Sequence, residues 1–517
     1  MDDTLEIITE KPDLTGQSSF ARNLLFSWGG YVVNLIAGFV LPRMVDDRLG
    51  QFQLGVWDFA WTMIGYLGLM ELGIGGADRL FARDIATGDF TKLTRSVSSV
   101  TLCMVGIGFL MLIGALLVAL LVVPLFQDRL GTFTFSTQWV VFFLGTGAAV
   151  EVMLGAHWCV IIAVHRWDVH NTISSVVSLT ATLGMMLAML LGGGLVWMAG
   201  IQSVTRITGH LCRYVMARRV CPSLKFDFST ADFGVVREQM QFTGKNFLPR
   251  IADMLVNQTV SLLLVSFAGP AALAVFSRPR ALTKHVRTMV GKFSSILVTS
   301  ASAMQALEDN GGLRRMLLRR SEQASFFSVP AILWLSVIGG PIIELWMGKD
   351  YVHPGLVPIL SLGFIASLVQ DPVWAIMTGL NRHGRIALVK FGGSVACAGA
   401  VALGLYFGRD KLLWAALGLT LPMLLVDGFL VPAIACRAMQ VPLSGFYRIT
   451  LLKPFLLFLP AGICLAAARM VFEGNLLMIL GVGGGLAGLI QAGMFYKFAL
   501  PEKVRNRVRQ TFSPSRV

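Results

Sequence analysis

The feature that most constrains this chain is a series of apolar stretches, each about 20 residues long, that recur along its 517 residues. A helix of about 20 residues rises about 30 Å, the thickness of the hydrocarbon core of a bilayer. Apolar residues make up 55% of the chain and charged residues only 14%, too few to cover a water-soluble globule of this size. The chain is therefore predicted to be an all-α polytopic membrane protein.

About fourteen such stretches are predicted to span the membrane. An even number of spans places both termini on the same side. The predicted spans are residues 22–44, 54–78, 97–126, 138–164, 169–192, 195–217, 241–267, 271–305, 317–347, 354–379, 385–408, 412–436, 447–471 and 475–500.

The distribution of positive charge predicts the orientation. The chain has 43 Lys and Arg against 29 Asp and Glu, a net charge of +14. Most loop cations lie in one set of loops, and cytoplasmic loops are the basic ones. Both termini are therefore predicted to be cytoplasmic, and the charge indicates contact with anionic lipid and not with nucleic acid. The opposite loops contain only Arg43, Arg48, Arg129, Lys349, Arg409, Lys411 and Arg469.

A weak internal repeat divides the chain. Leu49-Gly50 aligns with Ala268-Gly269 at a spacing of 219 residues, and the same spacing relates Asp89 to Glu308. Residues 22–25 align with 245–248, and Val33-Asn34 with Val256-Asn257, at a spacing of 223 residues. The repeat predicts two parallel lobes of six helices around a central cavity, with two further C-terminal helices.

The predicted domain organisation follows from this repeat. It comprises a cytoplasmic N-terminal tail (1–21), an N-lobe (22–217), a cytoplasmic linker (218–240), a C-lobe (241–436), two additional helices (437–500) and a basic cytoplasmic tail (501–517).

One predicted span, residues 271–305, contains an unusual number of cations. A Lys or Arg at the centre of a lipid-facing helix costs about 2.5–3.5 kcal/mol, so these side chains are not expected to face lipid. The helical period places Arg280, Lys284 and Arg287 on one face and Arg278, His285 and Lys292 in a second stripe at heptad spacing. Such a cluster suits phosphate or pyrophosphate, although an amphipathic segment outside the membrane, or snorkelling from a helix end, would also explain it. The full set is Arg278, Arg280, Lys284, His285, Arg287 and Lys292.

Other charged residues lie inside predicted spans. Arg250 and Asp253 stand at positions i and i+3, where an internal ion pair and a substrate contact are both open interpretations. The acids Asp58, Glu71, Asp253 and Asp371 could bind a coupling proton or cation, or neutralise a nearby cation.

Motifs typical of enzymes and cofactor sites are missing from the sequence. There is no G-x-x-x-x-G-K-[ST], H-E-x-x-H or G-x-S-x-G, so an ATPase, a metalloprotease and a serine hydrolase are not indicated. The 7 cysteines are scattered without a C-x-x-C pair. We therefore expect no catalytic residues, no cofactor and no metal.

The sequence around the first two predicted helices resembles a known family. Leu49-Gly50-x4-Gly55-Val56-Trp57 is followed by Leu72-Gly73-Ile74-Gly75 and Ala77-x-Arg79. This pattern is similar to the polysaccharide-transporter branch, with its Wzx-type O-antigen and exopolysaccharide flippases, of the multidrug/oligosaccharidyl-lipid/polysaccharide exporter superfamily. The Arg-Asp pair typical of the lipid II flippase branch, near the end of the first helix, is absent.

The resemblance implies a function. It implies alternating access that moves an undecaprenyl pyrophosphate-linked oligosaccharide from the cytoplasmic to the periplasmic leaflet of a bacterial inner membrane, for O-antigen, capsule or exopolysaccharide synthesis. Expected partners are this substrate, membrane lipids, and a polysaccharide polymerase with its chain-length machinery. The alternative within the superfamily is a multidrug or toxin cation antiporter, and a membrane glycan enzyme or a scaffold are more distant ones. The residues expected to bind the anionic substrate are Arg250, Arg278, Arg280, Lys284, His285, Arg287 and Lys292.

Overall fold

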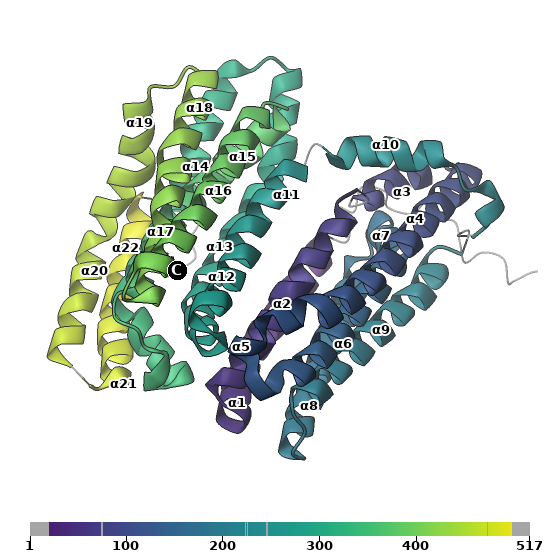
Figure 1. Ribbon diagram of the computed structural model, residues 1–517. Helices are drawn as coiled ribbons and strands as arrows, with labels where there is room; N and C mark the ends of the chain where they lie inside the picture. Colours follow the sequence, from purple (N-terminus) through teal and green to yellow (C-terminus); the bar gives the residue numbers. More distant parts are fainter. Residues whose placement is uncertain are drawn as a thin grey trace, which may run out of the picture. The chain divides into compact units, whose positions relative to one another are not determined.

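The computed structural model describes residues 20–73, 76–222, 224, 226–244, 247–472 and 474–498. Within these ranges every regular element is a helix, which confirms the predicted all-α class (Figure 1). The basic tail 501–517, nearly all of the N-terminal tail 1–21, and the repeat match at residues 245 and 246 lie outside the described residues.

The chain forms two compact units, residues 1–250 and 251–517, here called unit 1 and unit 2. The helices of unit 1 are α1 (Phe20–Leu49), α2 (Gln51–Leu67), η1 (Gly68–Gly73), α3 (Ala77–Ala86), α4 (Phe90–Leu117), η2 (Val118–Val122), η3 (Val123–Phe126), α5 (Gln127–Leu130), η4 (Gly131–Phe133), α6 (Thr134–Met153), α7 (Gly155–Ala163), α8 (Trp167–Leu190), α9 (Leu195–Val220), η5 (Phe228–Thr230) and α10 (Phe233–Gly244).

Helix α11 (Phe247–Met254) contains the boundary between the units. The remaining helices belong to unit 2: η6 (Leu255–Thr259), α12 (Val260–Ala268), α13 (Pro270–Ala306), α14 (Asn310–Met347), η7 (Lys349–Tyr351), α15 (Leu356–Gly379), α16 (Gly384–Phe407), α17 (Lys411–Leu425), η8 (Val426–Leu430), α18 (Val431–Ala438), α19 (Leu443–Tyr447), η9 (Arg448–Leu452), α20 (Lys453–Val471), α21 (Leu476–Met478), η10 (Ile479–Gly483) and α22 (Gly484–Phe498).

The helices confirm a multi-pass membrane protein. Ten helical stretches of the described residues are long and apolar enough to cross a bilayer. One of them, Phe90–Met153, contains both α4 and α6, which pack against each other. Helix α2 has only 17 residues, and α9 and α13 are less apolar than the ten, so these three are not among them. The exact count of fourteen spans therefore stays a prediction.

Large apolar side chains lie on the outside of both units. Leu121 is 63% exposed, Leu183 61% and Leu489 73%, and many other large apolar side chains are also exposed. In water such an apolar surface would cause association or aggregation, whereas it is the surface expected of a protein that faces lipid.

The helices of the two units pack in the same order. In unit 1, α1 contacts α2 and α8, α6 contacts α2, α4 and α9, and α8 contacts α9. In unit 2, α12 contacts α13 and α16, α15 contacts α13, α14 and α17, and α16 contacts α17. The final helices α20 and α22 pack against each other, and α20 packs against α14 (Figure 1). This recurring order supports the two-lobe organisation that the sequence predicts.

Two turns show how the repeat aligns. Gly50 and Gly269 have φ of +88° and +84°, a conformation that favours glycine, so the structure agrees with their pairing in the sequence. Asp89 and Asp309 are both N-caps, of α4 and α14, and their carboxylates each accept a backbone amide hydrogen bond. The partner of Asp89 is thus Asp309, and the predicted pairing with Glu308 is wrong by one residue. Glu308 instead has φ of +55° in the preceding turn.

The predicted linker, residues 218–240, is docked on unit 1. The amide of Asp227 donates to Ser98 Oγ at 3.0 Å, and the amide of Asp232 donates to Ser99 Oγ at 2.8 Å. Helix α10 packs against α4 and lies at the same end of unit 1 as α3 in Figure 1. These contacts explain why compact unit 1 extends beyond the predicted N-lobe.

One core cluster of unit 2 lies where one end of α13 and of α15 meets α14, α16 and α18. Its buried members include Leu297, Leu317, Ile376, Ile386 and Phe446.

Candidate functional site

The cations of α13 differ in how deeply they are packed within unit 2. Helix α13 contacts α12, α14 and α15. Arg278 is only 4% exposed, and its Nε donates to the carbonyl of Ala274 at 3.2 Å. It is therefore packed inside the unit, and the structure separates it from the other cations that the sequence grouped with it.

Arg280 faces the segment that joins α11 to α12. Its guanidinium donates to Asn257 Oδ1 at 2.9 Å and to the carbonyl of Val256 at 3.4 Å. Both acceptors lie in the π-helical turn η6, a type of irregularity that is frequent at functional sites. The guanidinium carbon also lies 5.8 Å from the centre of the Phe276 ring. Arg280 is half-buried and held at one terminal nitrogen.

Arg287 lies about two helical turns further along α13 and faces α11, the helix that precedes η6. A terminal nitrogen lies 3.8 Å from Asp253 Oδ1, and the two side chains are 35% and 68% exposed. An ion pair this exposed contributes little stability. Lys284 lies between Arg280 and Arg287 in the helix and is exposed. We name Arg280, Lys284 and Arg287 the cationic face; the contacts of its two arginines agree with the predicted spacing on one side of α13.

The remaining predicted cations are His285, Lys292 and Arg250. His285 is half-buried on α13, and the side chain of Lys292 lies outside the described residues. Arg250 is an exposed residue of α11 and the last residue of unit 1. The predicted second stripe of Arg278, His285 and Lys292 is thus not one exposed surface, because Arg278 is buried.

Acids from three helices accompany Arg287. Asp253 lies on α11, Asp371 on α15 and Asp427 in η8, and all three are within electrostatic range of its guanidinium. Asp371 faces α13, since a Cβ added to Gly291 would lie 4.0 Å from Asp371 Oδ2. The arrangement partly compensates a positive charge that would otherwise be unfavourable within a spanning helix.

A second ionic contact lies deeper in unit 2. Lys390 Nζ on α16 is 3.4 Å from Asp427 Oδ1, and Ser367 Oγ on α15 donates to Asp427 Oδ2 at 2.6 Å. Asp427 is 7% exposed. The sequence does not indicate this pair as a site, because its members are 37 residues apart and no spacing rule relates them.

Unit 1 contains its own ionic cluster. Glu151 on α6 is 2.8 Å from Arg206 Nε on α9 and 3.4 Å from His210 Nε2. The Arg206 guanidinium carbon lies 5.4 Å from the centre of the Trp61 ring on α2. The spacing of Arg206 and His210, four residues apart on a spanning helix, is the sequence signal that would have indicated this cluster.

The remaining predicted acids of unit 1 lie near α2. Asp58 is a half-buried residue of α2. Glu71 in η1 is within electrostatic range of Glu151 and Arg206. Glu71 can therefore join the ionic cluster of unit 1, whereas Asp253 and Asp371 belong with the cationic face of unit 2.

Comparisons with known proteins indicate a family and a fold. A family model described as polysaccharide biosynthesis protein matches residues 85–354, which include all of α13. A comparison with curated proteins found no match in sequence.

Among solved structures, the lipid II flippase MurJ in an inward closed conformation is similar, with 14% identity, a TM-score of 0.65, and coverage of 92% of this chain and 99% of that one. An inward-facing multidrug resistance MATE family transporter of the MOP superfamily has 11% identity and a TM-score of 0.59, covering 81% and 96%. The Vibrio cholerae MATE transporter VcmN, in its bent form, has 16% identity and a TM-score of 0.52, covering 84% and 99%. At these identities the likeness shows the fold.

Proposed function

The chain belongs to the polysaccharide biosynthesis protein family, and on this premise we propose that it is a flippase for a polyprenyl pyrophosphate-linked oligosaccharide. It would carry this lipid across the bacterial inner membrane by alternating access, for O-antigen, capsule or exopolysaccharide synthesis. A polysaccharide polymerase and chain-length machinery would receive the product. The basic loops support an orientation with both termini in the cytoplasm.

The observation that carries the proposal is the cationic face of α13. Arg280, Lys284 and Arg287 extend over about 10 Å of helix axis, a length that accommodates two linked phosphates. The hydrogen bonds of Arg280 to described residues use one terminal nitrogen. The other N–H groups of its guanidinium can therefore donate to a phosphate in a bidentate contact. The polyprenyl tail would remain in lipid while the charged headgroup moves along a hydrated path.

The neighbouring acids suit a transport cycle. A carrier must bind its substrate differently in its two states, or transport would not turn over. Asp253 can compete with a phosphate for Arg287, because its Oδ1 lies 3.8 Å from a guanidinium nitrogen of that arginine. Asp58, Glu71, Asp253 and Asp371 are the proposed coupling or charge-balancing acids. Membrane potential acting on the anionic substrate is an alternative driving force.

A reconstituted flipping assay tests this function. Proteoliposomes containing a fluorescent polyprenyl pyrophosphate-linked glycan would be treated with a membrane-impermeant quencher, and the protected fraction measured over time. The unmodified chain should move the lipid between leaflets, and Arg280→Glu with Arg287→Glu should reduce the rate to that of empty liposomes. Arg280→Gln with Arg287→Gln tests the same charges with less disturbance of folding.

A matched control variant carries the same Arg→Gln changes at two arginines outside α13. Arg129→Gln with Arg409→Gln also removes two exposed arginines, from the opposite loops, and should leave flipping unchanged. Flipping by the α13 variants at the unmodified rate would show that the cationic face is not the binding site. No flipping by the unmodified chain, together with efflux of a cationic drug, would favour the multidrug antiporter instead.

A further inference from the structure

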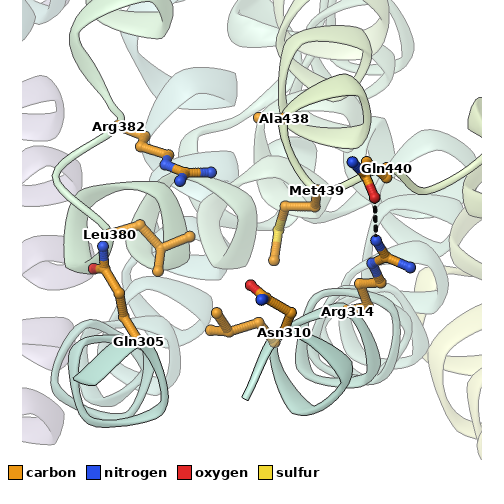
Figure 2. Close-up of a pocket in the computed structure, with 9 residues that line it drawn as sticks. Gln305, Asn310, Arg314, Leu380, Arg382, Ala438, Met439 and Gln440 are labelled. Atoms are coloured by element: carbon orange, nitrogen blue, oxygen red, sulfur yellow. Dashed lines mark hydrogen bonds between the residues drawn. The ribbon is translucent and has the colours of Figure 1, made fainter. Parts of the chain in front are cut away.

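Two adjoining pockets lie at the ends of the helices of unit 2, away from the cationic face. The first has a volume of about 290 Å³, and Arg314 and Arg382 are among the residues that line it. Figure 2 shows these two side chains on opposite sides of the opening, with Asn310 and Met439 between them. The second has a volume of about 470 Å³ and is lined by Arg382, Arg385 and Arg437, among others. Because Arg382 lines both, the two pockets form one basic depression.

We name this depression the arginine pocket, after Arg314, Arg382, Arg385 and Arg437. Its described lining contains these four arginines and no acidic residue. Arg314 donates to Gln440, whereas none of the other three arginines has a hydrogen bond or ion pair with a described side chain. Cations in loops repel one another, and their electrostatic energy falls when they move apart. Their convergence on one concave surface therefore indicates an anionic ligand.

Buried apolar side chains form the floor of the arginine pocket. Leu313, Met377, Leu380 and Met439 line the two pockets and belong to one packed core cluster of unit 2. The four arginines are exposed and therefore stand at the rim of a surface formed by packed core residues. An apolar floor with a cationic rim suits a phosphate group that carries an apolar substituent.

The location in the fold restricts the source of the ligand. The pocket is built by the turns between α13 and α14, α15 and α16, and α18 and α19. Turns at the ends of spanning helices lie at the depth of lipid headgroups. The same turns belong to the basic loops that the sequence predicts to be cytoplasmic, where anionic lipid is concentrated.

We propose that the arginine pocket binds the phosphate group of an anionic molecule at the membrane surface. The chemistry recognised is a phosphate held by two or more guanidinium groups, supplied by a phospholipid headgroup or by a free phosphate compound. None of the residues involved belongs to the cationic face, so this site is independent of the proposed transport function.

The test uses the purified full-length chain in detergent. Binding of phosphatidylglycerol and of phosphatidylcholine would be compared by native mass spectrometry, and inorganic pyrophosphate would be titrated by calorimetry. The site variant is Arg382→Gln with Arg385→Gln and Arg437→Gln. The matched control is Arg48→Gln with Arg129→Gln and Arg409→Gln, which removes three exposed arginines outside the pocket.

We expect the site variant to bind phosphatidylglycerol or pyrophosphate at least tenfold more weakly, and the control to stay within twofold of the unmodified chain. Binding of phosphatidylglycerol alone identifies the lipid as the source, and displacement of it by pyrophosphate identifies the shared phosphate chemistry.

Three results would overturn the proposal: equal weakening in the site and control variants, no preference of the unmodified chain for either anionic probe, or loss of binding in Arg280→Gln with Arg287→Gln. The last result would assign the ligand to α13. Retained binding in a chain that fails to flip lipid would reject the proposed function and leave the arginine pocket supported.

Discussion

Two substitutions in one ion pair should change anion binding in opposite directions. Asp253→Asn removes a competitor for Arg287, whereas Arg287→Gln removes a ligand of the substrate. The relevant separation is 3.8 Å between a guanidinium nitrogen and Asp253 Oδ1. Coulomb's law at an effective dielectric constant of about 20 gives about 4 kcal/mol as an upper bound. Because both side chains are partly exposed, screening reduces this energy to about 0.2–1 kcal/mol.

These energies convert into changes in affinity. Release of Arg287 in Asp253→Asn should strengthen binding of a pyrophosphate lipid by up to about fivefold. Loss of a charged hydrogen bond in Arg287→Gln removes about 1.5–3 kcal/mol and should weaken binding by about ten- to a hundredfold. The assay is equilibrium binding of a fluorescent polyprenyl pyrophosphate to the chain in nanodiscs, with thermal unfolding measured in parallel.

The opposite signs separate two roles for the pair. If Arg287 and Asp253 were only a structural ion pair, both substitutions would lower the unfolding temperature and neither would strengthen binding. A weaker affinity in Asp253→Asn, with unchanged stability, would refute the assignment of Arg287 to the substrate. A control is Glu344→Gln, which neutralises an exposed carboxylate on α14 without a described partner at the cationic face and should change neither quantity.

Three further predictions concern the scaffold. A Cβ at Gly418 would lie 2.7 Å from a backbone nitrogen of α16, so Gly418→Ala should cost about 1–3 kcal/mol of stability, while Gly399→Ala, with open space around it, should cost nothing measurable by thermal unfolding. Removing one partner of the Lys390–Asp427 pair, as in Lys390→Met, should cost about 3 kcal/mol by leaving a buried charge, and the double variant Lys390→Met with Asp427→Leu should recover most of it. The side-chain hydroxyl and the backbone amide of Ser229 both donate hydrogen bonds to the Asp227 carboxylate. These bonds lower the pKa of Asp227 below its usual 3.8. The carboxylate therefore stabilises its turn fully above about pH 4 and progressively less as the pH falls through the lowered pKa, which hydrogen exchange over residues 227–230 would follow.

The cationic face illustrates what periodicity can predict. Arg280, Lys284 and Arg287 follow the helical repeat, and the contacts of the two arginines with α11 and η6 place them on one side of α13. The same periodicity grouped Arg278 with His285 and Lys292. A helical wheel gives the angle between side chains but not which angle is covered by a neighbouring helix, and the packing of unit 2 buries Arg278.

The sequence does not predict which charged residues of distant helices form ionic clusters. Glu151 meets Arg206 and His210 across α6 and α9, and Lys390 meets Asp427 across α16 and η8. Each residue by itself reads as a charged group within an apolar stretch. Partner choice depends on which helices become neighbours, and that follows from packing of side chains along their whole length.

The sequence alone therefore determined the membrane environment, the helical class, the approximate helix positions and the side of α13 that carries Arg280, Lys284 and Arg287. These properties depend on segment length, local hydrophobicity and a period of 3.6 residues, all of which are local. Only the tertiary structure decided that Arg278 is buried, that Asp89 corresponds to Asp309, that the linker docks on Ser98 and Ser99, and that four arginines meet at one pocket. Each of these depends on contacts between segments far apart in the chain, whose partners no local pattern specifies.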